Sequence, residues 1–328
     1  MTHIAPSELE AVLHQAAIAT LEDRAFLRVT GADATRWLNG MVTNSVQALA
    51  PGQGSYNFLL NAQGRILGDC TVYREPGPAD PPTFLLETQS SQLEALQRHL
   101  DHFIIMDDVE LTPAFSDDTS LVVIGPEAPR VLAAAGLPAP DPLRFAHADS
   151  PQGPVQIFTA HSADLPRFQL RSSLGELLAL RSALLIAGAR EIAHDALEAA
   201  RLLEGSPRYG QDITEKHLPQ ETNQQYALHF SKGCYLGQEI VERIRSRGQV
   251  HRVLTPLTLT GQMPTELPAP LQANGQPAGE ITSAMLVPLT EGPQILALGY
   301  VRREALDTHQ PLTYTGGTAT PRSTNASH

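Results

Sequence analysis

The chain has 328 residues and a formal net charge of −12 at pH 7. This length exceeds that of one ordinary hydrophobic core, so we expect two or three domains. Hydrophobic residues make up 42% of the chain and charged residues 18%, which is typical of a soluble globular protein. The acidic balance argues against nonspecific binding of nucleic acid or of an anionic membrane by the whole molecule, but it leaves room for a local basic patch.

The cysteines and the start of the chain exclude further classes of protein. The two cysteines, Cys70 and Cys234, form no CxxC pair, which excludes a disulfide framework and a cysteine-only zinc site. The first twenty residues contain no basic region ahead of an apolar stretch, and the apolar stretch at 177–189 is interrupted by Arg181. We therefore predict neither a signal peptide nor a membrane span, and we place the protein in the cytoplasm.

The first third of the chain alternates helical and strand patterns. Apolar residues at helical spacing predict a packing helix over residues 7–21, with Ser7 as its N-cap. The following elements are a strand over 26–30, a helix over 32–38, a hairpin with strands over 56–60 and 65–74, a strand over 83–87, a helix over 91–100 and a strand over 103–111. A proline-rich loop at 76–82 reads as a solvated connector.

Two histidines lie close to an aspartate at the end of the helix predicted over 91–100. His99, Asp101 and His102 are types of residue that bind metals, but no further ligand cluster accompanies them. We interpret them as charge pairing at a helix terminus and predict no metal site.

The pattern restarts after residue 119. We predict strands over 120–125, 143–146, 155–160 and 167–171, with helices over 126–135, 174–186 and 194–203. From residue 250 to 314 short strands alternate with Gly and Pro turns, and residues 315–328 are rich in Thr, Ser, Gly and Asn, which predicts a disordered tail. The order of elements indicates an α+β protein, without a regular βαβ repeat or a nucleotide fingerprint.

The most informative stretch is the octet of residues 232–239, which reads Lys-Gly-Cys-Tyr-Leu-Gly-Gln-Glu. Residues 238–245 place Ile240 and Ile244 on one face and so predict a short amphipathic helix. Cys234 then lies just before a helix N-terminus, where free amides and the helix dipole favour a thiolate, and Lys232 adds a cation nearby. An inert cysteine buried in a glycine-flanked turn is the alternative interpretation.

The octet, with Arg243 four residues after it, is similar to the signature of the YgfZ family of folate-binding proteins, relatives of the glycine-cleavage T-protein. Other segments also resemble this superfamily. They include Gly31-Ala32-Asp33-Ala34, Leu38-Asn39-Gly40, Thr43-Asn44, Gly205-Ser206-Pro207, Pro219-Gln220-Glu221-Thr222-Asn223 and Leu298-Gly299-Tyr300-Val301-Arg302. The resemblance spans residues 7–314.

The resemblance implies a T-protein-like folate-binding fold of two α/β subdomains plus a C-terminal β-barrel. We expect a first folate-binding subdomain over residues 1–116 and a second over 117–248, which ends in the octet. The barrel would occupy residues 249–316, and the disordered tail 317–328.

The ligand that the resemblance implies is tetrahydrofolate or a one-carbon derivative of it. A reduced pterin has an amide-plus-amine edge that a carboxylate binds with paired hydrogen bonds, while its flat ring favours aromatic walls. The predicted cofactor-binding residues are Glu204, Asp69, Tyr56, Asn57, Tyr209 and Arg243. In an ungapped match, Glu204 lies one residue beyond the position of the T-protein glutamate. Asp69 and Glu204 could each also have a purely structural role.

The function that the resemblance implies is support of iron-sulfur cluster assembly or repair in client proteins and, through them, of tRNA modification. Cys234 would be the redox or sulfur-facing group beside the folate, activated by Lys232. Iron-sulfur clusters are normally held by four cysteines, so we do not expect this chain to hold one alone.

Two alternatives remain open. The first is a folate-dependent one-carbon or aminomethyl transferase. In the T-protein two adjacent aspartates lie on the return strand and the first is tied to aminomethyl transfer, whereas this chain has Gly68 before Asp69, which argues against that activity.

The second alternative is an RNA-binding module. It would use the basic run Arg243, Arg245, Arg247, His251 and Arg252. The same run could receive the anionic glutamate tail of folate, or could simply complement the dipole at a helix end. The acidic charge of the chain disfavours direct contact with tRNA.

Overall fold

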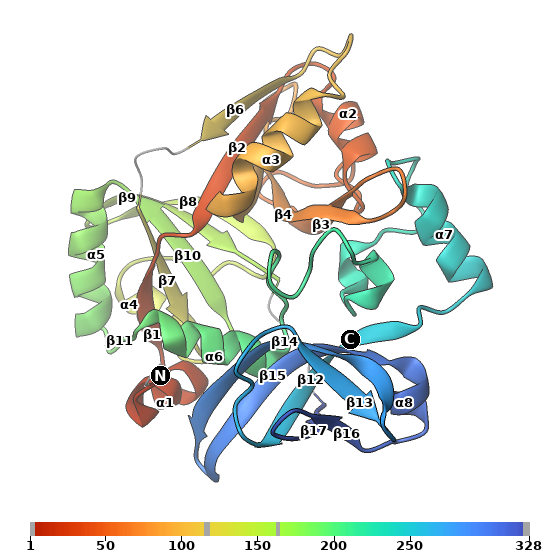
Figure 1. The fold of residues 1–328 in the computed structure, drawn as a ribbon. Helices are drawn as coiled ribbons and strands as arrows, with labels where there is room; N and C mark the ends of the chain where they lie inside the picture. The colour runs from red at the N-terminus through yellow and green to blue at the C-terminus, as the bar shows by residue number, and fades with distance from the viewer. Residues whose placement is uncertain (1–3, 115–118, 162–164, 324–328) are drawn as a thin grey trace.

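The computed structural model describes residues 4–114, 119–161 and 165–323. These residues form two sheets, each covered by helices, and a closed barrel that packs beneath the second sheet (Figure 1). The segment between α6 and the barrel, which includes the octet, runs along the side of the first sheet (Figure 1).

The first sheet is antiparallel, with the strand order β3-β4-β5-β2-β6. Its strands are β2 (Arg24–Thr30), β3 (Gly54–Leu60), β4 (Ile66–Arg74), β5 (Phe84–Gln89) and β6 (Glu110–Ala114), and its helices are α2 (Ala34–Met41) and α3 (Ser90–Asp101). Cys70 and Val72 of β4 join Trp37 and Leu96 in the core under these helices. Because side chains alternate along a strand, Asp69 and Thr71 face the other side of this sheet.

The second sheet has the order β11-β1-β7-β10-β9-β8. Its strands are β1 (Ala17–Leu21), β7 (Thr119–Ile124), β8 (Arg144–Ser150), β9 (Gly153–Thr159), β10 (Arg167–Ser172) and β11 (Arg190–Glu191). The accompanying helices are α1 (Pro6–His14), α4 (Ala128–Ala134), α5 (Leu174–Ile186) and α6 (His194–Glu204).

The start of the chain differs from the predicted helix over 7–21. The helix α1 ends at His14, and β1 pairs with β7 in antiparallel fashion and with β11 in parallel. Ala17 and Ile18 are almost fully buried between these partners, so pairing with distant strands prevails over the local helical spacing. The first strand therefore belongs to the second sheet, although its residues precede the first sheet in the chain.

A second difference lies between α3 and β6, where the sequence predicts a strand over 103–111. The strand β6 begins only at Glu110, and residues 103–109 form turns. Asp33 holds this segment, since its carboxylate accepts the N–H of Asp108 at 3.0 Å and its own N–H donates to the Asp108 carbonyl at 3.1 Å.

The barrel closes in the order β12-β15-β14-β13-β16-β17. Its elements are β12 (Arg252–Gly261), β13 (Ala269–Ala273), β14 (Gln276–Leu289), β15 (Gly292–Arg302), α8 (Arg303–Asp307), β16 (Leu312–Tyr314) and β17 (Gly317–Pro321). The prediction of a disordered tail over 317–328 is wrong for residues 317–321, because β17 pairs with β12 and β16 and closes the barrel. Residues 324–328 lie outside the described part of the chain.

The segment between α6 and the barrel contains two short 3-10 helices and the helix α7. They are η1 (Pro219–Glu221), η2 (Gln225–Ala227) and α7 (Gln238–Arg247). No helix in the described parts of the chain is long and apolar enough to span a membrane.

Candidate functional site

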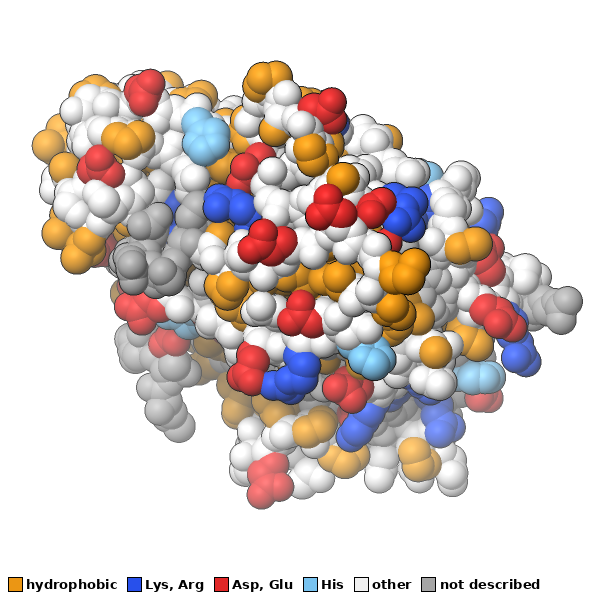
Figure 2. Space-filling view, turned by 90° about the horizontal axis from the view of Figure 1, so that it is seen from above, with side chains coloured by type: hydrophobic (Ala, Val, Ile, Leu, Met, Phe, Trp, Pro, Cys, Tyr) orange, Lys and Arg blue, Asp and Glu red, His pale blue; other side chains and the backbone are white. Residues whose placement is uncertain are grey.

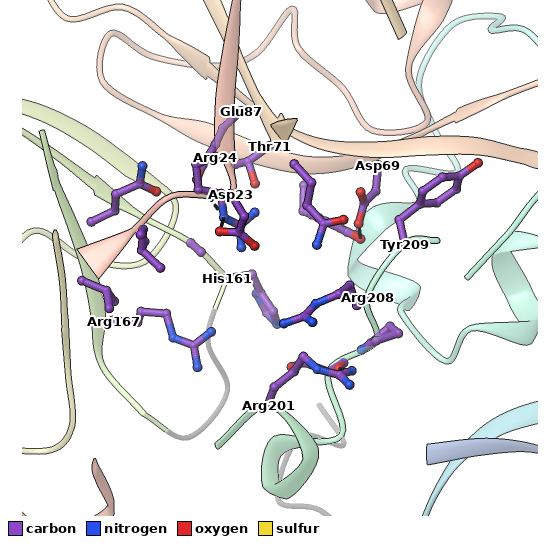
Figure 3. A pocket seen from close by; sticks show the side chains of 18 of the residues that line it. Asp23, Arg24, Asp69, Thr71, Glu87, His161, Arg167, Arg201, Arg208 and Tyr209 are labelled. Carbon is purple, nitrogen blue, oxygen red and sulfur yellow. Dashed lines mark hydrogen bonds and ion pairs between the residues drawn. The ribbon is translucent and has the colours of Figure 1, made fainter. Parts of the chain in front are cut away.

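A pocket of about 200 Å³ lies where the first sheet, the second sheet and α6 meet (Figure 3). The strands β4 and β5 contribute Asp69, Thr71 and Glu87, and β7 and β10 contribute Val122 and Gln169. The helix α6 and the segment after it complete the wall with Leu197, Arg201, Ser206, Pro207, Arg208, Tyr209, Gln224 and Tyr226.

Asp69 is held in a fixed orientation on the pocket side of β4. Tyr56 donates its hydroxyl proton to Oδ2 at 2.7 Å, and Gln92 donates from Nε2 to Oδ1 at 2.8 Å. The Gln92 carbonyl in turn accepts the backbone N–H of Asp69 at 3.1 Å. The sequence did not single out Gln92. The available signal is its spacing, because a residue four positions before Leu96 lies on the same inward face of α3.

Gly68, the residue before Asp69, faces away from the pocket. A Cβ atom at this position would lie 2.5 Å from Cδ2 of Leu96 and 2.9 Å from Oε1 of Gln92, both on α3. A larger residue here would therefore enter the core under α3, and not the ligand cavity. The carboxylate on the pocket side of β4 is Asp69, so glycine at position 68 removes no carboxylate from this cavity.

Aromatic rings form one wall of the pocket. The ring centroids of Tyr56 and Tyr226 are 5.5 Å apart, and the His161 ring stacks on Tyr226 at 3.7 Å. Burial raises the pKa of Tyr209 to about 12, and burial together with Asp69 raises the pKa of Tyr56 well above its usual value. These phenols are therefore neutral hydrogen-bond donors at physiological pH. Tyr226 and His161 are further lining residues that the sequence did not single out.

Basic side chains surround the rest of the cavity, namely Arg24, Arg167, Arg201 and Arg208 (Figure 3). Arg24 lies 3.9 Å from the buried Glu87 carboxylate, whose pKa is raised by burial, an effect that the charge of Arg24 partly offsets. Arg208 pairs with Glu198 at 2.9 Å. The pocket thus combines phenols with the carboxylates of Asp69 and Glu87 and with several guanidinium groups.

Two of the predicted ligand residues serve the structure around the pocket. Glu204 is buried and pairs with Arg167 at 2.9 Å, so it orients a guanidinium that lines the cavity. Asn57 is fully buried, accepting the Asn44 N–H at 2.8 Å and donating to the Ser55 carbonyl at 2.7 Å. Among the six predicted binding residues, those described as lining the pocket are Tyr56, Asp69 and Tyr209.

The octet forms a loop that is clamped to the first sheet and α2. The Lys232 ammonium donates to the carbonyl oxygens of Asn39, Val42 and Asn44 at 2.6–2.7 Å. An ammonium has three protons, so these carbonyls take all of them. Burial lowers the pKa of Lys232 to about 7, while the hydrogen bonds to the three carbonyls favour its charged form. The prediction that Lys232 activates the thiol is therefore not supported by its orientation.

The glycine that ends the loop is required by a close approach. Gly237 has φ +81°, and a Cβ atom there would lie 2.5 Å from the Asn61 carbonyl oxygen on the β3–β4 hairpin. Tyr235 is buried against Phe58 and Leu60 of the same hairpin. Lys232, Tyr235 and Gly237 of the octet thus have structural roles in the fold.

Cys234 is the exception, because its thiol is exposed to solvent. The alternative of a buried cysteine is therefore wrong. The described residues that line the pocket do not include Cys234, so the structure does not bring the thiol and the cavity together directly. The two are linked through one hydrophobic cluster, in which Tyr235 is buried and against which Tyr56 and Tyr209 pack.

Two arginines of the basic run after the octet, Arg245 and Arg252, pair with acidic residues of the chain. Arg245 lies over the Phe230 ring at 4.5 Å and pairs with Glu242 at 3.4 Å. Arg252 contacts Glu221 and Glu280 at 3.1 and 3.3 Å. Arg243 is exposed and is not among the described pocket residues.

Comparisons with known proteins identify a family model and relatives that this chain resembles. The model of the GCVT N-terminal domain matches residues 1–153. The iron-sulfur cluster assembly factor IBA57 of Mus musculus, a mitochondrial protein, is 30% identical over 288 residues, which cover 79% of this chain and 72% of that protein. The chain belongs to the family of IBA57 and the T-protein. The aminomethyltransferase of Frankia alni is 27% identical, with coverage of 79% and 71%.

A solved structure supports the same family fold. Aminomethyltransferase T of the glycine cleavage system from Bartonella henselae superposes with a TM-score of 0.82 at 21% identity, covering 98% of this chain and 89% of that one. The predicted T-protein-like fold with a C-terminal barrel is confirmed. In the described residues, no group of three or more His, Cys, Asp or Glu side chains is arranged to hold a metal ion.

Proposed function

We propose that this protein binds tetrahydrofolate, or a one-carbon derivative, in the pocket around Asp69 and acts in iron-sulfur cluster assembly or repair. Relatives named as iron-sulfur cluster assembly factors support the second part. The observation that carries the first part is the Asp69 carboxylate, held by Tyr56 and Gln92 on a wall of aromatic rings.

The residues present fit a reduced pterin. Each Asp69 oxygen accepts one bond within the protein and retains a lone pair for the donor edge of the ring. Tyr56, Tyr209 and Tyr226 supply flat apolar surface. Gln224 also lines the pocket, and its buried Oε1 has no hydrogen-bond partner in the described structure. When bound, the folate would supply the one-carbon or reducing chemistry, while these residues bind and orient it.

The size and charge of the cavity suggest how a folate would lie. Pockets that enclose a whole drug-sized ligand usually measure about 300–1,000 Å³. A cavity of about 200 Å³ therefore suits the pterin head, with the rest of the ligand extending toward the opening. The guanidinium groups of Arg24 and Arg208 lie around the same cavity, where they would attract the anionic glutamate tail.

The thiol of Cys234 is the second element of the proposal. Its loop is held by Lys232 and Gly237, so the sulfur is presented to solvent from a fixed support. One exposed thiol suits a transient contact with a cluster that is held mainly by another protein. The cluster is cargo in this scheme, and the client proteins are its recipients.

The finer parts of the proposal come from the resemblance of the octet to the YgfZ signature. We propose a YgfZ-type role, a cytoplasmic location and an indirect effect on tRNA modification through iron-sulfur clients. Fractionation of host cells tests the location, and analysis of modified nucleosides in a deletion host tests the effect on tRNA.

The experiment for the thiol replaces Cys234 by Ser in the full chain. We expect unchanged folding and unchanged folate affinity, because the thiol is exposed and is not a described pocket residue. We also expect the activity of iron-sulfur enzymes in a deletion host to fall to the level of the empty vector. Full complementation by Cys234→Ser would remove the thiol from the proposed function.

A second candidate, aminomethyl transfer, is favoured by the position of Asp69 on the pocket side of β4 with Gly68 behind it. A relative named aminomethyltransferase also aligns along most of this chain. The test measures the rate at which the protein forms methylenetetrahydrofolate from tetrahydrofolate and an aminomethyl donor. Activity that is lost in Asp69→Asn would establish this candidate, and folate binding without turnover would exclude it.

A further inference from the structure

The segment between α3 and β6 presents two large apolar side chains to solvent. Ile105 is 83% exposed and Met106 is 92% exposed. The segment projects at the top of Figure 1, beyond the helices that cover the first sheet. Figure 2 looks onto this end of the molecule, where hydrophobic, acidic and basic side chains lie next to one another. None of the described pocket residues comes from this segment.

The segment is rigidly built on its inner side. The Trp37 indole donates to the Phe103 carbonyl at 3.2 Å, and the Asp108 carboxylate accepts the Ala32 N–H at 3.2 Å. Arg36 pairs with Asp107 at 2.5 Å. Gly31 approaches so closely that a Cβ atom there would lie 2.0 Å from the Asp108 carbonyl oxygen.

Apolar contacts flank the exposed pair. Ile104 and Val109 both pack on the core under α2 and α3. The chain between them is therefore anchored at each end, and Ile105 and Met106 are held outward. Isolated exposed hydrophobic residues are common, but two adjacent ones on a rigid, projecting support form a preorganised contact that loses little entropy on binding.

The charge around the pair indicates what it contacts. Residues 99–110 contain four carboxylates, from Asp101, Asp107, Asp108 and Glu110, and no lysine or arginine. Arg36 pairs with Asp107, so the carboxylates of Asp101 and Glu110 give the exposed face of the segment its negative charge. An anionic membrane would repel this surface. A protein surface with basic side chains around an apolar cavity would complement it in both shape and charge.

We propose that residues 103–108 dock into an apolar pocket of a partner protein whose rim carries lysine or arginine. Ile105 and Met106 would be buried at the centre, and Asp101 and Glu110 would face the basic rim. This inference does not depend on folate binding or on the thiol.

The test introduces a photo-cross-linking residue at position 106 of the full chain in its host cells. Position 186 is the matched control, because Ile186 is 87% exposed on α5. We expect one discrete adduct with another protein from position 106 and none from position 186. The variant Asp101→Lys/Glu110→Lys, which leaves the anchoring bonds of the segment in place, should abolish that adduct.

The affinity of the purified cross-linked partner then gives the quantitative result. Serine at both 105 and 106 should weaken binding by roughly 100-fold, since two large apolar side chains lose their burial. Ile186→Ser should change the affinity by less than about twofold, and the thermal unfolding of every variant should match that of the wild type. Equal binding by Ile105→Ser/Met106→Ser, an adduct insensitive to charge reversal, cross-linking to a second copy of this chain, or sedimentation with phosphatidylserine vesicles would overturn the proposal.

Discussion

Asp212 should be a sensitive position for stability. Its side chain is fully buried. One carboxylate oxygen accepts bonds from Arg201 Nη1 at 2.7 Å and from the Arg208 N–H at 3.0 Å, and the other accepts the Thr282 and Ser283 hydroxyls at 2.5 and 2.6 Å. The carboxylate therefore joins the segment after α6 to β14 of the barrel.

Replacement by Ala removes all of these bonds and leaves the Arg201 guanidinium buried without this counter-charge. Removing one partner of a buried ion pair costs about 3–5 kcal/mol, so Asp212→Ala should lower the free energy of unfolding by about that amount. Asp212→Asn keeps the shape and loses the charge, and we expect a smaller loss of about 1.5–3 kcal/mol.

Urea unfolding of the two variants measures both values, with Asp149→Ala as the control. Asp149 is exposed on β8, so its replacement should change the free energy of unfolding by less than about 0.5 kcal/mol. A loss below about 1 kcal/mol in Asp212→Ala, where about 3 kcal/mol is expected, would refute the assignment of Asp212 as the link between the barrel and the pocket wall.

Four further predictions follow from individual contacts. Gln92→Leu should weaken folate binding about 10-fold by freeing the Asp69 carboxylate, and calorimetry showing equal affinity would contradict this. Lys232→Met should lower the free energy of unfolding by about 2–3 kcal/mol, because buried carbonyls lose a charged donor; a wild-type urea midpoint would rule this out. Gly237→Ala should cost at least about 1–3 kcal/mol through overlap and positive φ, as measured by the shift of the thermal midpoint. Burial holds the pKa of His217 at about 4, below the usual 6.5, so the folded state binds fewer protons than the unfolded state between these values. Stability should therefore fall by up to roughly 3 kcal/mol as pH drops from 6.5 to 4, and urea titrations of His217→Gln should show a flatter dependence than the wild type.

The sequence was sufficient where structure is local. The hairpin of β3 and β4, the helix α5 and the helix after the octet follow from periodicity, turn residues and glycines. The strands β1 and β17 could not be predicted in this way, because each is defined by partners far away in the chain. Ala17 pairs with residues 124 and 190, and Ala319 with residues 259 and 312. The residues next to each strand in the sequence do not indicate which distant strand it pairs with.

In the candidate site, too, the sequence identified some residues but not the contacts made with distant parts of the chain. The family resemblance pointed to Asp69, Tyr56 and Tyr209, which the structure brings to one pocket. The directions of other side chains depend on tertiary neighbours. The motif predicts that Glu204 contacts the ligand and that Lys232 activates the thiol. In the structure Glu204 pairs with Arg167, and Lys232 donates to carbonyls near the end of α2.

The most direct test of the proposed function is calorimetric titration of the purified full chain with 5-formyltetrahydrofolate. We predict binding of one folate per chain, a loss of at least about 10-fold in affinity for Asp69→Asn, which exchanges an acceptor for a donor at the pterin edge, and an unchanged affinity for Cys234→Ser. Absence of binding by the wild type, or equal affinity of Asp69→Asn, would contradict the assignment of this pocket to folate.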